Sequence, residues 1–322
     1  MNVLITSAGR RVSLVRAFQQ ELKKLDENAQ VFAADASPVE SSACHAADGY
    51  FQVPRLDNPD YFIALEKICK ENHISLVIPT IDTELLPMAQ RKEEFLAKGI
   101  RFVVADEQFV HKCRDKRQIH DFFMENGVQV AREFSKDKYE LPLFIKPIDG
   151  SRSVDTYLIR EESELTDYHF KNDKLMFLEY LDHQEFEEFT CDMYYDQSNR
   201  LRCVVPRKRV EVRDGEVNKG LTQRNAIIPY LQERMSFIEG AIGCLTAQFF
   251  LHKEDSRVYG IEINPRFGGG YPLSYLAGAN FPAWILSEYM RNEKVADHFD
   301  DWEADLLMLR YDHEILVHGY QG

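Results

Sequence analysis

Short apolar runs alternate with segments of helical spacing over the first hundred residues. The apolar runs predict buried strands at Asn2–Thr6, 31–34, 76–79 and 100–104. Apolar residues at helical spacing, such as Val12, Val15 and Phe18, predict three helices at Val12–Leu25, Tyr61–Glu71 and 83–98. Strands that alternate with helices form parallel sheets with crossover helices. We therefore expect an α/β domain with a parallel sheet at the N-terminus.

The pattern changes after about residue 110. A helix is predicted over residues 110–126, with Gly127 as its C-cap. Apolar runs then follow one another without helices, at 141–146, 154–159, 174–180, 186–194 and 202–209. The first two of these runs flank a short loop and predict a hairpin. Consecutive strands of this kind are typical of an antiparallel α+β region.

The composition is that of a globular protein with an excess of acidic residues. The 322 residues are 44% hydrophobic and 29% charged, with a formal net charge of −14. Such a chain is poorly suited to nonspecific binding of nucleic acid or anionic membranes, which needs an excess of Lys and Arg. The six cysteines lack metal-site or disulfide-framework spacing, and neither a signal-peptide core nor a membrane-spanning apolar run occurs. We expect a cytoplasmic protein that binds neither nucleic acid nor membrane.

The segment 258–270 carries the most specific chemistry. Glu262 and Asn264 are two positions apart on a predicted strand, so their side chains project from one face. Arg266 and three glycines follow, and Gln248 lies on the preceding predicted strand, from which a turn would bring it to the same face. Carboxylate and amide oxygens suit Mg²⁺ and the phosphates that it bridges. The alternative is an exposed polar strand face that runs into a glycine loop.

Two further segments would fit a nucleotide. Lys146 ends a predicted strand before a loop with Gly150 and Ser151, and a lysine beside a glycine turn suits a phosphate. The alternative is a surface lysine before an ordinary turn. The apolar strand that ends at Glu179 passes to a loop whose backbone can meet a purine edge, and Glu188 can accept hydrogen bonds from a ribose. The alternative there is a buried strand followed by solvated acids.

The carboxyl ends of the predicted parallel strands carry polar side chains, and this edge is where α/β sheets bind ligands. The candidates are Arg10 and Arg11 after the first strand, and Asp82 and Glu84 after the third. Two cations facing a carboxylate and two acids facing an ammonium would read a small zwitterion such as an amino acid. The alternative is that the arginines are exposed helix-start residues. A dinucleotide is disfavoured because Gly9 is the only glycine of the first turn.

These features occur in an order that resembles the ATP-grasp superfamily, and within it proteins similar to the carbamoyl phosphate synthase large subunit. The resemblance covers nearly the whole chain, to about Tyr275. It implies a pre-ATP-grasp domain at residues 1–108. It also implies an α+β ATP-grasp fold of two lobes, at 109–182 with the glycine loop and at 183–322 with the metal site.

The resemblance also implies roles for single residues. Asp115-Lys116 would open the first ATP-grasp helix, with Lys116 at the phosphates. The other implied roles are Lys146 and the Gly150-Ser151 loop at the phosphates, the backbone of Glu179, Tyr180 and Leu181 at the adenine, Glu188 or its neighbour Glu187 at the ribose, Gln248, Glu262 and Asn264 at Mg²⁺, and Arg266 at the reacting groups.

A cluster of cations at 206–222 lies between the ribose acid and the metal strand. The family lines its acceptor and γ-phosphate site with this region, so we expect contacts from Arg209 and Lys219. The alternative is a solvated charged hairpin. With Arg266 and Lys146, these two residues complete the predicted catalytic set.

The resemblance implies a ligase that uses ATP and Mg²⁺, or Mn²⁺ in its place. A carboxylate would attack the γ-phosphorus to form an acyl phosphate, which an amine then attacks. Two alternatives stay open: activation of bicarbonate as in carbamoyl phosphate synthesis, and a nucleotide-binding module without turnover. The expected partner is a small carboxylate or amino-acid-like substrate, and a homodimer is compatible with the sequence. The sequence names neither the carboxylate nor the nucleophile, nor a partner enzyme that delivers substrate.

Overall fold

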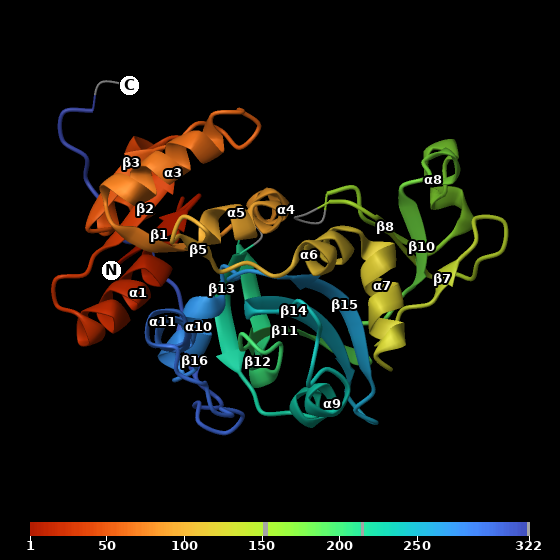
Figure 1. Ribbon diagram of the computed structural model, residues 1–322. Coiled ribbons are helices and arrows are strands. Elements are labelled where there is room, and N and C mark those ends of the chain that lie inside the picture. Colours follow the sequence, from red (N-terminus) through yellow and green to blue (C-terminus); the bar gives the residue numbers. More distant parts are fainter. Residues whose placement is uncertain (151–153, 214–215, 321–322) are drawn as a thin grey trace.

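The computed structural model describes residues 1–150, 154–213 and 216–320, and within these ranges the strands form three β-sheets (Figure 1). We call them the N-terminal sheet, the small sheet and the large sheet, with five, four and seven strands respectively in the described ranges. In Figure 1 the N-terminal sheet lies at the upper left, the small sheet at the right and the large sheet below them. No helix in these ranges has the length and apolar character needed to cross a bilayer.

The N-terminal sheet is parallel throughout, which confirms the predicted α/β domain. Its order is β3-β2-β1-β4-β5, with β1 (Asn2–Thr6), β2 (Val31–Asp35), β3 (Gly49–Gln52), β4 (Ile74–Ile78) and β5 (Arg101–Phe102). The helical segments are α1 (Val12–Leu25), η1 (Pro38–Glu40), α2 (Ser42–Ala46), α3 (Tyr61–Glu71), α4 (Asp82–Gln90) and α5 (Lys92–Leu96). The central strand β1 is buried on both faces, which is why it reads as a continuous apolar run.

Two details of this domain differ from the sequence prediction. The single helix predicted at 83–98 is two helices, α4 and α5, because the backbone of Arg91 leaves the helical conformation between them. The sequence pattern also does not predict β3. Its four residues alternate between half-buried and exposed, and so short an edge strand gives too weak a signal.

The small sheet is antiparallel and has the order β7-β10-β8-β9. Its strands are β7 (Glu133–Phe134), β8 (Leu143–Pro147), β9 (Tyr157–Ile159) and β10 (Leu175–Glu179), with η2 (Glu162–Glu164) and α8 (Asp167–Lys171) between β9 and β10. The predicted hairpin is present as β8 and β9, although β9 begins three residues later than the apolar run from 154 indicated.

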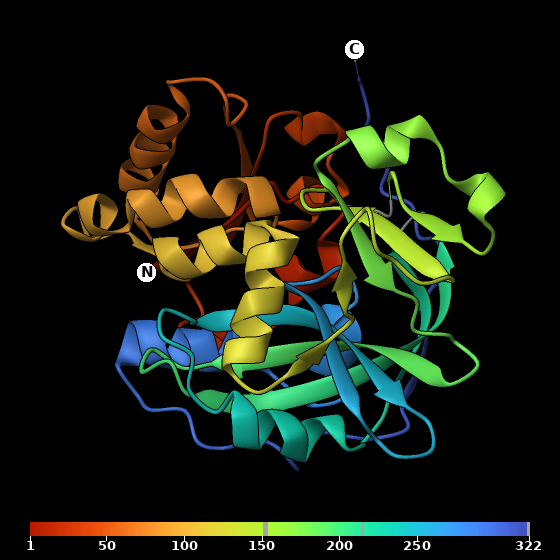
Figure 2. The same cartoon turned by 90° about the vertical axis from the view of Figure 1, so that its right-hand side faces the viewer.

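The large sheet has the order β16-β13-β12-β11-β14-β15-β6 and is antiparallel except where β6 runs parallel to β15. Its strands are β6 (Gln129–Val130), β11 (Phe186–Tyr195), β12 (Leu201–Arg213), β13 (Glu216–Thr222), β14 (Gly243–His252), β15 (Val258–Asn264) and β16 (Leu307–Leu309). The helices α9 (Ile227–Arg234), α10 (Tyr271–Leu276) and α11 (Phe281–Arg291) accompany it. Figure 2 shows α9 on the side that faces away from the other two sheets.

The helix predicted at 110–126 is also two helices, α6 (Glu107–Arg114) and α7 (Lys116–Glu125). Asp115 separates them, because its backbone is extended and its side chain accepts a hydrogen bond from the backbone N–H of Arg117 at 2.8 Å. Helix α7 then packs closely on β15. A Cβ added to Gly260 would lie 2.6 Å from the ring of Phe123, so this approach requires glycine.

Buried apolar side chains form two separate clusters in the described ranges. The larger cluster is continuous through the N-terminal sheet, α6, α7 and the large sheet. The smaller cluster belongs to the small sheet and consists of Leu143, Ile145, Ile159, Leu175 and Phe177. The small sheet therefore has a core of its own. The division of the chain at residues 109 and 183 stays a prediction, and α6 and α7 share the larger core.

A buried ion pair lies inside the large sheet. Arg207 donates from Nε and Nη2 to the two carboxylate oxygens of Asp192 at 2.7 and 3.0 Å, and the two side chains are 1% and 0% exposed. Ser274 Oγ donates to the same carboxylate at 2.5 Å, and Thr246 Oγ1 lies 3.3 Å from it. Gly270 covers the pair, since a Cβ there would lie 2.1 Å from Arg207 Nη1.

Arg207→Met should lower the free energy of unfolding by about 3–5 kcal/mol, because it leaves the Asp192 carboxylate buried without its counter-ion. Urea denaturation measures this loss. The matched control is Arg213→Met at the end of β12, where the ion pair with Asp312 is exposed and contributes little. Equal losses of stability in the two variants would contradict the importance of the buried pair.

Candidate functional site

Lys146 and Lys116 lie together where the small sheet meets α7. Lys146 is the next-to-last residue of β8, and its side chain is buried. Lys116 is the first residue of α7 and donates from Nζ to the carbonyl of Gly150 at 2.9 Å, while its backbone N–H donates to the carbonyl of Ile148 at 2.9 Å. The structure thus brings both predicted phosphate lysines to the start of the predicted phosphate loop. Ser151 of that loop lies outside the described residues.

Burial lowers the pKa of Lys146 to about 8. The charge of Lys116 lowers this pKa further, whereas the opposite charge of Glu262 raises it. Lys146 on the small sheet is therefore within electrostatic reach of Glu262 on the large sheet. An ammonium that is poorly hydrated at the junction of two sheets attracts an anion more strongly than an exposed lysine does.

The three predicted metal residues share one face of the large sheet. Gln248 on β14 stands directly opposite Glu262 on β15, and Asn264 is two positions further along the same strand. Asn264 Nδ2 donates to Glu262 Oε1 at 3.0 Å, which leaves its amide oxygen for another partner. Two amide oxygens and one carboxylate make an oxygen-only donor set of the kind that Mg²⁺ accepts when phosphates complete its shell.

A chelating cluster of the usual transition-metal type is not part of this site. No group of three or more His, Cys, Asp and Glu side chains that could hold a metal occurs in the described ranges. The donor set of Gln248, Glu262 and Asn264 carries a single negative charge. Such a set fits a hard cation that arrives with a polyanion rather than a resident ion.

The segment after β10 connects the small sheet to the large sheet. Glu179 ends β10 with an exposed side chain, Tyr180 is half-buried and Leu181 is buried. The backbone N–H of Glu179 donates to the carbonyl of Arg132 at 2.8 Å. This places the predicted adenine segment between the two sheets, with the N–H of Glu179 committed to the protein.

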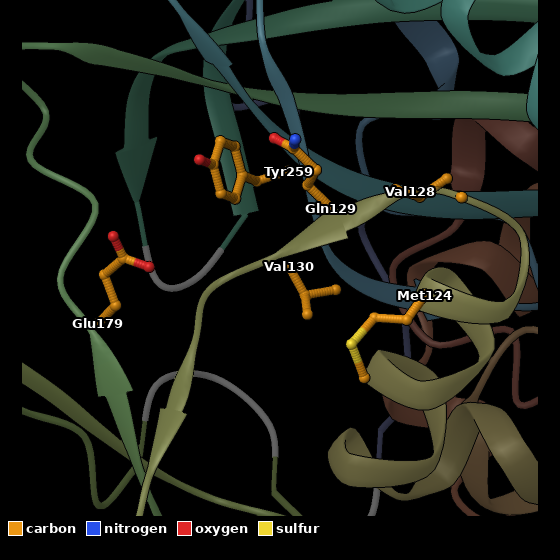
Figure 3. A pocket seen from close by; sticks show the side chains of 7 residues that line it. Met124, Val128, Gln129, Val130, Glu179 and Tyr259 are labelled. Carbon is orange, nitrogen blue, oxygen red and sulfur yellow. The ribbon is translucent and has the colours of Figure 1, made fainter.

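A cavity of about 450 Å³ opens beside this connection (Figure 3). Met124 from α7 and Glu179 from β10 lie on opposite sides of it in Figure 3. Its lining residues are Met124, Gly127, Val128, Gln129, Val130, Glu179 and Tyr259. The lining contains neither the two lysines nor the three metal candidates, so the cavity is distinct from the phosphate and metal residues.

The register of the large sheet separates the two ribose candidates. Thr190 stands opposite Gln248, so Glu188 projects from the face that carries the metal candidates and Glu187 projects from the other face. Arg209 Nη1 donates to Glu188 Oε1 at 2.9 Å, whereas Lys208 pairs with Glu187 at 2.7 Å. The structure therefore favours Glu188, with Arg209 as its neighbour on the same face.

Lys219 does not join Arg209, contrary to the prediction that both line one acceptor site. Arg209 stands opposite Gly220, so the adjacent Lys219 projects from the opposite face of the sheet. Its ammonium pairs with Glu211 at 2.6 Å, and both side chains are partly exposed. The local alternation of the strand separates the two side chains, and a part for Lys219 in an acceptor site stays a prediction.

Arg266 reaches out of the large sheet to the N-terminal domain. It donates from Nε and Nη2 to Oδ1 and Oδ2 of Asp82, the first residue of α4, at 3.1 and 2.9 Å. The next residue, Phe267, packs edge-on against Phe18 of α1, with ring centroids 5.9 Å apart. Asp82 therefore contacts a predicted catalytic arginine, whereas the sequence predicted that it faces a substrate ammonium.

Glu84 is not on a ligand-binding rim, contrary to the sequence prediction. Its side chain is buried, and it accepts hydrogen bonds from the hydroxyls of Thr6, Ser7 and Tyr61 at 3.1, 2.6 and 2.9 Å. Burial raises the pKa of this carboxyl, and the three hydroxyls act in the opposite direction. Glu84 lies two residues after Asp82, about half a helical turn, so the two side chains leave α4 in different directions.

Arg10 and Arg11 lie at the start of α1, where Arg10 is exposed and Arg11 half-buried. The loop before them is firmly held. Ser7 and Gly9 both have a φ of 47°, and the N–H of Gly9 donates to Asp35 Oδ2 at 3.0 Å. The arginines therefore project from a fixed turn at the carboxyl edge of the parallel sheet, and their contact with a substrate stays a prediction.

His120 belongs to the site, although the sequence analysis did not find it. It is buried on α7, and burial together with the charge of Lys146 lowers its pKa to about 3. Its Nε2 has no hydrogen-bond partner among the described residues, and its ring bonds to the backbone of Ile261. The available signal was its position four residues after Lys116, which places both on one helix face.

Comparisons with known proteins match both halves of this architecture. A family model described as "PylC-like, N-terminal domain" matches residues 3–103, and one described as "ATP-grasp in the biosynthetic pathway with Ter operon" matches residues 171–308. A carbamoyl-phosphate synthase of Methanobrevibacter smithii is 24% identical over 299 residues, which are 85% of this chain and 77% of that protein.

Solved structures share the fold at low sequence identity. An L-amino acid ligase from Bacillus licheniformis matches with a TM-score of 0.65 and 18% identity, over 90% of this chain and 74% of that one. A second match is the biotin carboxylase domain dimer of Hydrogenobacter thermophilus 2-oxoglutarate carboxylase, in complex with MgADP, ADP and bicarbonate. Its TM-score is 0.68 and its sequence identity 15%, over 95% of this chain and 73% of that one. Rhizobium etli pyruvate carboxylase matches with a TM-score of 0.69 and 13% sequence identity over 95% of this chain, which spans 30% of that protein.

The two family models cover the N-terminal domain and most of the large sheet. The three-sheet architecture is shared with ligases and carboxylases across 90% or more of the chain. The chain therefore combines a parallel-sheet N-terminal domain with an ATP-grasp domain, and it is an enzyme similar to the ATP-grasp ligases.

Proposed function

We propose that this protein uses ATP and Mg²⁺ to activate a small carboxylate as an acyl phosphate for attack by an amine. One observation carries the proposal: a predicted phosphate lysine and a predicted metal residue interact electrostatically although they lie on different sheets. Lys146 of the small sheet lies within electrostatic reach of Glu262, which stands in register with Gln248 on the large sheet. A nucleoside triphosphate needs both, because its phosphates attract the cations and also bind a divalent metal.

The nucleotide would span the junction of the two sheets. Lys146 and Lys116 would hold the phosphates, and Gln248, Glu262 and Asn264 would hold Mg²⁺. When bound there, Mg²⁺ supplies positive charge to the phosphate oxygens. Glu188 would accept hydrogen bonds from the ribose, and the connection after β10 would contact the adenine through its backbone. Mn²⁺ has similar ligand preferences and is the alternative cation.

The reaction needs charge and positioning from the chain rather than a covalent intermediate on a side chain. The substrate carboxylate attacks the γ-phosphorus, and ADP leaves with the electrons of the broken P–O bond. Arg266 pairs with the carboxylate before this step and with the acyl phosphate after it. The amine nitrogen then attacks the acyl carbon, inorganic phosphate leaves, and the amine loses a proton to give the amide.

An amino acid or another small carboxylate is the substrate that we favour. Arg10 and Arg11 at the sheet edge suit a carboxylate, and one structural neighbour is named an L-amino acid ligase. Bicarbonate is the second candidate, because the curated relative is named a carbamoyl-phosphate synthase and another neighbour was solved with bicarbonate. That neighbour is also described as a dimer, which supports a homodimer as part of the proposal.

The experiment that tests the function is ADP release from Mg-ATP with a panel of L-amino acids, dicarboxylates and bicarbonate, each combined with candidate amines. Hydroxylamine in place of the amine should trap the acyl phosphate as a hydroxamate. A carboxylate that accelerates ADP release and yields its hydroxamate supports the proposal. Mg-ATP binding without carboxylate-dependent ADP release would favour the nucleotide-binding module without turnover.

Glu262→Gln should abolish Mg²⁺-dependent ADP release, because it removes the only negative charge of the proposed metal set. Titration calorimetry should show that the variant binds ATP equally with and without Mg²⁺, whereas the wild type binds Mg-ATP more tightly. The control is Asp255→Asn in the exposed turn between β14 and β15, which should keep the wild-type Mg²⁺ dependence. Wild-type turnover by Glu262→Gln would exclude this residue as a metal ligand.

Nucleotide affinity should fall as the pH rises through about 8, because the buried ammonium of Lys146 loses its proton there and can no longer pair with phosphate. Bound phosphate favours the charged form, so affinity is highest below this pKa. Lys146→Arg keeps a charge at all these pH values and should remove the pH dependence of nucleotide affinity.

Lys146→Met should weaken ATP binding at pH 7 by an order of magnitude or more, since a charged hydrogen bond contributes about 1.5–3 kcal/mol. Calorimetric titrations at several pH values measure both effects, and an unchanged pH dependence in Lys146→Arg would contradict the assignment.

A further inference from the structure

The contact between Asp82 and Arg266 joins two domains at a residue of proposed chemistry. The two residues are 184 positions apart, yet both carboxylate oxygens of Asp82 accept from Arg266, at 3.1 Å from Nε and 2.9 Å from Nη2. Two parallel N–H···O bonds fix the plane of a guanidinium as well as its position. A single bond to the same arginine would leave that plane free to turn.

The choice of nitrogens decides which edge of Arg266 is presented to a ligand. A guanidinium has five N–H donors. Asp82 takes the edge formed by Nε and Nη2, while Nη1 lies 3.4 Å from the carbonyl of Phe267. The edge formed by Nη1 and the second N–H of Nη2 therefore points away from Asp82. That edge has the spacing for a second carboxylate or a phosphate.

The arginine is held in a poorly hydrated place. Its side chain is 16% exposed, whereas that of Asp82 is 43% exposed. The segment that carries Arg266 is also fixed on the N-terminal domain at two other points, by Phe267 against Phe18 and by Tyr275 of the following helix α10, whose hydroxyl donates to Glu21 at 3.0 Å. The loop would therefore stay docked if Asp82 were changed, and the guanidinium alone would lose its orientation.

We propose that Asp82 is a positioning residue, which turns the Nη1–Nη2 edge of Arg266 toward the carboxylate that is being activated. This inference rests on the proposed function, because it assumes that Arg266 meets the reacting groups. It gives the N-terminal domain a part in the phosphoryl-transfer step through an ion pair. In this role Asp82 acts on the substrate through Arg266 and not by direct contact with a substrate ammonium.

The position of Asp82 also links its ion pair with Arg266 to the carboxyl edge of the parallel sheet. Asp82 begins α4, and Glu84 in the same turn accepts from the hydroxyls of Thr6 and Ser7 in the loop that leads to Arg10 and Arg11. Thr80, just before α4, donates to the carbonyl of Ser7 at 2.8 Å. A carboxylate bound at that loop would rest on the same support that orients Arg266.

The test is a double-mutant cycle with Asp82→Asn and Arg266→Lys, with kcat for ADP release measured on the best carboxylate of the panel. Asp82→Asn should lower kcat by roughly 10- to 100-fold, as a small misplacement of a reacting group does, and leave the dissociation constant of Mg-ATP within about twofold. In the Arg266→Lys background, which lacks the bidentate guanidinium, the same change should alter kcat by less than about threefold. Asp82→Glu should restore part of the loss, since it can still accept two bonds. Equal losses in both backgrounds would overturn the proposal.

A readout without turnover separates this inference from the proposed function. The ¹⁵Nε–¹H signal of Arg266, assigned by its absence in Arg266→Lys, should be protected from solvent exchange in the wild type and lose that protection in Asp82→Asn. Glu94→Gln on the exposed face of α5 is the control and should leave the signal unchanged. An unprotected signal in the wild type would disprove the proposal that Asp82 orients the guanidinium of Arg266. A protected signal, with no carboxylate-dependent ADP release, would instead disprove the proposed function.

Discussion

The buried carboxylate of Asp192 is the constraint on which the arrangement around β15, the strand with the metal candidates, depends. A charge with no access to water is stable only when donors surround it, and here they come from three different elements. Arg207 lies on β12, Thr246 on β14 and Ser274 on α10, while Asp192 itself lies on β11. Satisfying one carboxylate therefore fixes three elements around its strand in a single arrangement.

The buried ion pair also explains why glycines occur in the loop after β15. A Cβ on Gly268 would lie 2.8 Å from Thr246, and one on Gly270 would meet the guanidinium of Arg207. The loop therefore lies directly on the buried pair, and the carbonyl oxygen of Arg266 lies 3.0 Å from Thr246 Oγ1, whose single hydrogen is shared between this carbonyl and Asp192. The backbone of Arg266 is thus fixed on the large sheet, while its side chain extends to Asp82 of the N-terminal domain. A motif that reads as flexible in sequence is thus tightly held in the fold.

The two hydrophobic cores explain how the proposed nucleotide site is divided. The metal candidates and Arg266 belong to the unit formed by the N-terminal sheet and the large sheet, which share one core. Lys146 lies on the small sheet, whose core is separate. Motion of the small sheet would therefore change the distance from Lys146 to Glu262 without disrupting the larger core.

The sequence by itself determined what depends on local patterns. It predicted the parallel N-terminal sheet from apolar runs that alternate with helical spacing, the β8–β9 hairpin from two apolar runs around a short loop, and the common face of Glu262 and Asn264 from the period-two alternation of a strand. Only the tertiary structure decided what depends on neighbours distant in the chain. Glu84 turns inward to three hydroxyls, Lys219 projects from the face opposite Arg209, and Asp82 meets Arg266. Each of these outcomes depends on the packing of one element on another, and a one-residue difference in register or about half a helical turn reverses the direction of a side chain.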